Sequence, residues 1–132
     1  MYEFHGWFGV RESVRDIDEG GLEAIIRSIR QLIDSFAWGA GYCALHVING
    51  EYFVLTAGLR NHRGEEAHDL ASLFSFLAHE APGSYGLLYW RDDEDKSPPG
   101  PLFYRVRVLA RGVVTDRVDP FLSPVIPALE DP

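Results

Sequence analysis

The chain has only one cysteine among its 132 residues, Cys43, so it cannot form an intrachain disulfide. This excludes a small secreted scaffold that disulfides hold together. Residues 1–5 have neither the basic start nor the apolar stretch of a signal peptide, and no apolar run is long enough to span a bilayer. These absences together predict a cytoplasmic protein with no membrane partner.

Basic residues are also scarce, because 12 Lys and Arg face 20 Asp and Glu, for a formal net charge of −8 at pH 7. A protein that binds nucleic acid through its phosphates needs a basic face, so the charge argues against a nucleic-acid partner. An acidic balance favours either simple solubility or a basic partner. Since 46% of the residues are apolar, the chain can bury a core, and its length fits one domain over residues 1–132.

Patterns typical of catalytic or metal sites are missing as well. His68 and His79 are eleven positions apart on a predicted helix, about 16 Å along its axis, so they cannot share an ion. His62 and His68 could approach each other, but no cysteine or carboxylate stands at ligand spacing. Cys43 and His46 are three apart on a predicted strand, so their side chains point to opposite faces. We therefore expect no metal, no cofactor and no catalytic residue, and predict that the protein is not an enzyme.

The pattern of apolar residues predicts two helices and at least five strands. Aromatic residues over 2–11 predict a first strand, and Asn49-Gly50 predicts a hairpin between strands at 42–48 and 51–57. Seven apolar residues predict an amphipathic helix because they recur at helical spacing. They are Leu22, Ile25, Ile26, Ile29, Leu32, Ile33 and Phe36. A second helix begins at Glu65 and stops before Pro82-Gly83, and strands follow at 84–91 and 102–110.

The order of these elements predicts an α+β fold, with two helices packed on one face of a mostly antiparallel sheet. The first six elements match the ferredoxin-like βαββαβ plan, although a different strand order stays open. Residues 112–114 either extend the last strand or begin an extra C-terminal one. Four prolines after Asp116 exclude regular helix or central strand there, so residues 116–132 are predicted to form an extended Pro-rich tail packed on the body.

An acidic run, Asp92-Asp93-Glu94-Asp95, follows Trp90 at the end of a predicted strand. Four adjacent carboxylates repel one another and are expected to stay solvated rather than form a buried acid–base pair. They also lack the spacing of a calcium-binding loop. The run is therefore either an ordinary loop tip or a contact patch for a basic surface.

Four stretches carry a family resemblance: YEFHGW at 2–7, LYWRDD at 88–93, VRVLARG at 106–112 and DPFLSP at 119–124. In this combination and order they resemble the immunity protein 7 family of bacterial polymorphic toxin systems, over nearly the whole chain. The resemblance implies a small cytoplasmic antidote, not an enzyme, that binds one toxin domain and blocks it. No inhibitory motif can be carried over to particular residues.

The prediction for function is thus an immunity protein that binds and neutralises a cognate toxin domain by occlusion. A nuclease is one candidate for the toxin, since an acidic protein associates quickly with a basic cleft. The predicted partner-binding residues are Trp90 as an anchor and Asp92, Asp93, Glu94 and Asp95 as the steering charges. The chain is expected to be a monomer or a weak homodimer.

The alternative is a small enzyme or ligand-binding domain with a pocket between the sheet and the C-terminal tail. Its polar groups would be His46, His62, Arg105 and Arg107. Buried polar side chains that converge in one deep pocket would favour this alternative, whereas a flat acidic surface with aromatic neighbours would favour the binding protein.

Overall fold

The fold is known from a computed structural model that describes residues 1–15 and 20–124. The described chain contains two helices and six strands. In chain order they are β1 (Tyr2–Val10), α1 (Leu22–Asp34), β2 (Tyr42–Ile48), β3 (Glu51–Arg60), α2 (Glu65–Glu80), β4 (Tyr85–Asp92), β5 (Arg105–Ala110) and β6 (Val113–Val118).

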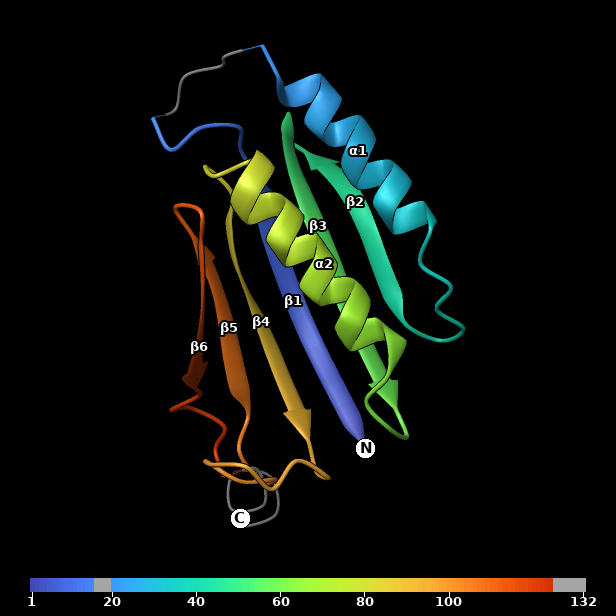
Figure 1. The fold of residues 1–132 in the computed structure, drawn as a ribbon, viewed down its shortest axis with the longest axis vertical. Coiled ribbons are helices and arrows are strands. Elements are labelled where there is room, and N and C mark those ends of the chain that lie inside the picture. Colours follow the sequence, from blue (N-terminus) through green and yellow to red (C-terminus); the bar gives the residue numbers. More distant parts are fainter. Residues whose placement is uncertain (16–19, 125–132) are drawn as a thin grey trace.

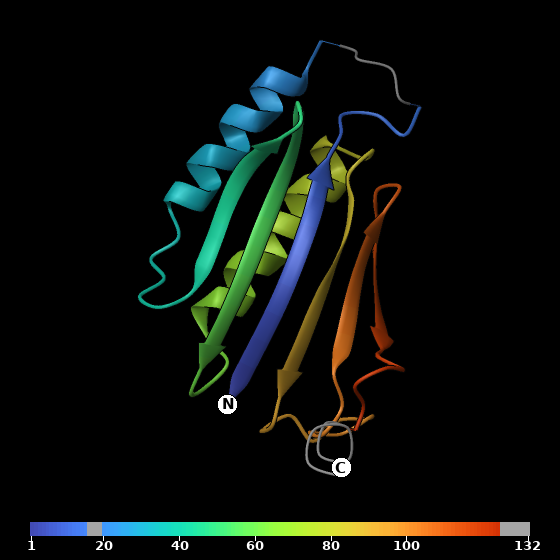
Figure 2. The same ribbon diagram turned by 180° about the vertical axis from the view of Figure 1, so that it is seen from behind.

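The strands form one antiparallel sheet in the order β2-β3-β1-β4-β5-β6. Both helices cover the same face of this sheet (Figure 1), and the opposite face has no helix over it (Figure 2). The predicted α+β class is therefore confirmed. The ferredoxin-like plan is not confirmed for the sheet as a whole, because β5 and β6 continue it beyond β4 to six strands.

Two tight turns set the register of the hairpins. Asn49 and Gly50 have φ of 50° and 81°, as a type I′ turn requires, and they join β2 to β3 where sequence reasoning placed a hairpin. Arg111 and Gly112 have φ of 53° and 75° and join β5 to β6 in the same way. An extra strand therefore follows this turn, which settles what residues 112–114 do.

The core lies between the sheet and the two helices. Side chains alternate between the faces of a strand, so Phe4 and Phe8 of β1 point to the helices and are fully buried. The Phe8 ring meets Phe74 of α2 edge-on, with 4.7 Å between ring centroids. Opposite Phe4 stands Gly58 of β3, where a Cβ atom would overlap the Phe4 ring. The large rings of β1 thus fill the centre because a strand neighbour leaves them room.

The strap, as we name residues 119–124, is fastened to the residue that precedes β5. The backbone N–H of Asp119 donates to the Tyr104 carbonyl at 3.0 Å, and the Tyr104 N–H donates to Ser123 Oγ at 2.9 Å. Because β6 continues to Val118, residues 116–118 of the predicted tail belong to the sheet. The last part of that tail, residues 125–132, lies outside the described residues.

Truncation after Arg117 tests the contribution of this segment to stability. The variant loses the pairing of Val118 with Arg105 and both strap hydrogen bonds. We expect the melting temperature to fall by about 5–10 °C, the effect of losing about 2 kcal/mol in a domain of this size, as measured by circular dichroism. Truncation after Pro124 keeps these contacts and should cost less. An unchanged melting curve after the longer truncation would contradict a structural role for the strap.

Candidate functional site

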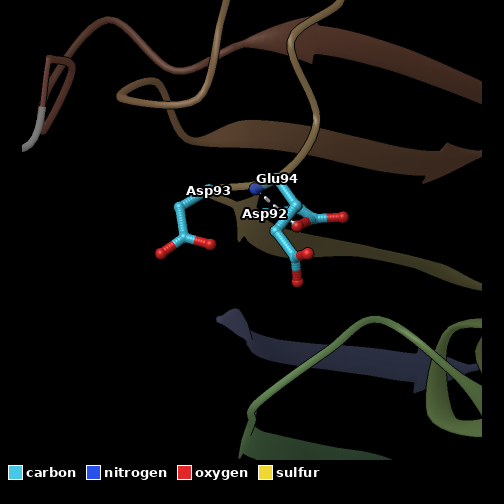
Figure 3. A group of neighbouring side chains, drawn as sticks. All are labelled: Asp92, Asp93 and Glu94. Carbon is cyan, nitrogen blue, oxygen red and sulfur yellow. Dashed lines mark hydrogen bonds between the residues drawn. The ribbon is translucent and has the colours of Figure 1, made fainter.

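The acidic loop, as we name residues 92–95, begins at the last residue of β4 and forms a hydrogen-bonded turn. Glu94 N–H donates to Asp92 Oδ1 at 3.0 Å, the bond drawn in Figure 3, and Asp95 N–H donates to the Asp92 carbonyl at 3.1 Å. Asp93 N–H donates to the Met1 carbonyl at 3.1 Å. The loop is thereby held against the start of β1.

The four carboxylates of this loop differ in exposure. Asp92 is only 9% exposed, which corrects the expectation that the whole run is solvated. Its backbone remains part of β4 and its side chain caps the turn, so it faces the protein. Asp93 and Glu94 have side chains 43% and 55% exposed, and Asp95 has 21%. Two carboxylates therefore point outward, and the other two hold the turn.

The N-terminal ammonium and an imidazole lie against the outward pair. The Met1 ammonium lies 2.6 Å from Asp93 Oδ1 and 3.8 Å from Glu94 Oε1, and its hydrogen bond lowers the pKa of Asp93. His62 Nδ1 lies 2.5 Å from Glu94 Oε1. Carboxylate oxygens of Asp92, Asp93 and Glu94 lie within 4.8 Å of one another, a spacing that could hold a cation. The ammonium and the imidazole already stand against this group, so we assign no metal to it.

Asp95 connects the loop to two arginines stacked on Trp90. Its Oδ2 lies 2.6 Å from Arg105 Nη1 and 3.8 Å from Arg63 Nη1. Hydrogen bonds from Ser97, and then from Arg105, lower the pKa of Asp95 to about 2. The guanidinium carbons of Arg63 and Arg105 lie 4.5 and 4.9 Å from the Trp90 ring centroid. This stacking fixes the loop onto the body of the protein.

Trp90 itself belongs to the core, since it is 6% exposed and contacts the Tyr2 ring. The sequence predicts Trp90 as an anchor for the partner, and this prediction is wrong for an exposed anchor, because the structure places the ring in the core. Its ring supports the acidic loop through Arg63 and Arg105 rather than offering an exposed surface.

Cys43 and His46 point to opposite faces of the sheet, as their spacing predicts. Cys43 packs against the core on the helix side, and burial raises the pKa of its thiol to about 11. A thiol with this pKa is protonated at neutral pH and is a poor nucleophile. His46 lies on the other face, where its Nε2 shares a 2.6 Å hydrogen bond with Tyr42 Oη. A cysteine–histidine pair is therefore absent at this strand.

The open face, as we name the side of the sheet without helices, is rich in aromatic and aliphatic side chains. Its largely exposed members are Trp7, Tyr42, Ile48, Leu59, Tyr85 and Val113. Sequence reasoning did not identify this surface. The only signal was that both alternating sets of residues in β3 and β4 are largely apolar, which is unusual for a sheet with one solvated face. Such a surface is typical of an interaction site.

A hollow of about 320 Å³ lies where the strap meets the open face. It is lined by His5, Tyr89, Tyr104, Asp119, Phe121 and Leu122. The predicted alternative required a pocket at this place, but with other polar groups. His62 is bonded to Glu94, Arg105 to Asp95 and Arg107 to Asp116, so these groups do not converge on the hollow.

The family model for immunity protein 7 matches residues 1–131. The chain belongs to the immunity protein 7 family. This confirms the resemblance carried by the four sequence stretches and supports the role of an immunity protein. No curated protein and no solved structure matches the chain. In residues 1–15 and 20–124, neither helix of this immunity protein 7 family member has the length and apolar character to cross a membrane.

Proposed function

We propose that the protein binds the cognate toxin domain of a polymorphic toxin system in the cytoplasm and neutralises it by occlusion, without catalysis. The observation that carries this proposal is the family match over residues 1–131. An immunity protein acts by binding one toxin, so a large contact surface matters more than a reactive group. The open face and the acidic loop together offer such a surface.

The acidic loop is the part of this surface that steers the encounter. Asp93 and Glu94 project from a turn that hydrogen bonds fix in place, and the whole chain carries a net charge of −8. Long-range attraction between an acidic surface and a basic one raises the association rate. A nuclease fits this charge best as the toxin, because its substrate cleft is basic.

The open face is the part that forms the stable contact. Aromatic side chains are enriched at the centre of protein interfaces because they bury a large area at low entropic cost. Trp7 and Tyr85 contact each other edge-on, with ring centroids 5.9 Å apart, and both are more than a third exposed. Such a pre-organised pair suits a contact that must form quickly and dissociate slowly.

Co-expression with a toxin domain encoded beside its gene, where a cognate toxin is expected, tests the proposal. The protein should restore growth of cells that make this toxin and should not do so with a toxin from an unrelated system. Purified together, the two proteins should co-elute as a complex, and an equimolar amount of the protein should abolish the toxin's activity. If the protein neither rescues the cells nor forms a complex with the adjacent toxin, the proposal is overturned.

A further inference from the structure

The hollow between the open face and the strap has aromatic walls. Tyr89 and Tyr104 line it from the sheet side, and Phe121 lines it from the strap. The Phe121 side chain is 79% exposed, so one wall stands free in solvent. The face of an aromatic ring attracts cations through its quadrupole. The walls are therefore suited to a positively charged group.

A buried carboxylate lines the same hollow. Asp119 is 1% exposed, and its Oδ2 accepts hydrogen bonds from the Leu122 N–H at 2.6 Å and from the Ser123 hydroxyl at 3.4 Å. Its Oδ1 is buried and has no hydrogen-bond partner in the described part of the chain. A buried polar atom without a partner is uncommon and costs free energy. Because Oδ1 is shielded from water, its charge is weakly screened inside the hollow.

The ion pairs among the described residues do not include Asp119, and the imidazole that also lines the hollow, His5, is paired with Glu3 at 2.7 Å. The Arg91 guanidinium lies 6.0 Å from the centroid of the Tyr104 ring, which lines the hollow. The ion pairs of the described chain do not include one between Arg91 and Asp119, and Arg91 Nε is itself buried without a partner. Tyr104 donates its hydroxyl proton to Glu3 at 3.1 Å, which places a second carboxylate beside this ring.

The geometry points to the hollow as the receptor for a cationic side chain, arginine or lysine, of the toxin partner. This inference rests on the proposed function, and it names the chemistry of the partner at one point of the open face. The rings of Tyr104 and Phe121 hold the cation, and Asp119 supplies the charge behind them. A neutral apolar side chain is the rival occupant, since most of the lining is apolar.

Titration of the isolated protein with short peptides separates these occupants. The probes are Ac-Gly-Arg-Gly-NH₂, its neutral citrulline counterpart and its leucine counterpart, with the Tyr89, Tyr104 and Phe121 ring signals followed by NMR. We expect saturable shifts with the arginine peptide, in the millimolar range that is typical of so small a ligand, and at least about fivefold weaker binding of the other two. Equal binding of the three peptides, or no shift with arginine, would overturn the inference.

Two variants test the roles of the carboxylate and of the free ring. Asp119→Asn keeps an acceptor for the Leu122 N–H but removes the charge. We expect this variant to bind the arginine peptide about tenfold more weakly than wild type does. Phe121→Leu keeps an apolar wall at an exposed position and should lower the affinity for the arginine peptide about threefold. This variant tests the proposal even if Asp119→Asn does not fold. Asp116→Asn, with a side chain 60% exposed on β6, removes the same charge elsewhere and should bind as wild type.

The same variants should weaken binding of the adjacent-gene toxin, with Asp116→Asn as the matched control. Equal toxin affinity for wild type, Asp119→Asn and Phe121→Leu would overturn this inference and leave the proposed function standing. A toxin that does not bind the wild-type protein at all would overturn the proposed function itself.

Discussion

Trp90→Ala is expected to lower the free energy of unfolding by about 3–5 kcal/mol, the usual cost of removing a buried tryptophan. The ring is 6% exposed, and it carries the guanidinium groups of Arg63 and Arg105. In a domain of this size the melting temperature should fall on the order of 10 °C or more. Urea unfolding monitored by circular dichroism measures the effect.

Two control variants isolate the cause. Trp90→Phe keeps an aromatic ring, and it loses no hydrogen bond because Trp90 Nε1 has no partner in the described chain, so it should cost only about 1–2 kcal/mol. Trp7→Ala removes the same side chain from the open face, where it is 41% exposed, and should cost about 1–2 kcal/mol. If Trp90→Ala were as stable as wild type but released the toxin faster, Trp90 would be an exposed anchor after all.

The elements of the fold that depend on local sequence could be predicted. The stripe from Leu22 gives α1, the turn at Asn49-Gly50 gives the β2–β3 hairpin, and Pro82 follows shortly after the end of α2. Local sequence does not predict the β5–β6 hairpin, because its turn places Arg111 at a positive φ of 53°. Arginine rarely adopts this conformation, so Arg111-Gly112 is not a recognisable turn signal. Strand β3 continues to Arg60 because β1 pairs with it over this length, a contact that local sequence does not contain.

The candidate site was predictable only in part, for the same reason. The acidic run is visible in the sequence, but the groups that pair with it, Met1, His62 and Arg105, come from distant positions. Local reasoning therefore describes four like charges that repel one another, whereas the fold places an ammonium, an imidazole or a guanidinium beside three of them. The predicted placement of both helices on one face already implies a face without helices (Figure 2), whereas the hollow depends on the path of the strap across that face, which local sequence does not contain.

The double variant Asp93→Asn/Glu94→Gln is expected to slow association with the toxin by about three- to tenfold at low ionic strength, with little change in dissociation. These two side chains are the outward carboxylates of the acidic loop. Asp92 and Asp95 stay unchanged because one is buried and caps the turn and the other holds Arg105. Exposed charges act mainly on the encounter, so added salt should shrink the difference between variant and wild type.

A matched control separates the place of the charges from their number. Asp34→Asn/Glu80→Gln also removes one Asp and one Glu, both exposed, at the last residues of α1 and α2. Neutral side chains are tolerated there because a helix C-terminus does not favour acidic residues. Stopped-flow measurements at two salt concentrations should show slower association for the loop variant than for this control. If both variants slow association equally, only the net charge matters, and if neither does, the loop has no part in steering. In the first case Asp93 and Glu94 act only as part of the net charge, and in the second they do not act on the encounter; either result would contradict a steering role specific to the acidic loop.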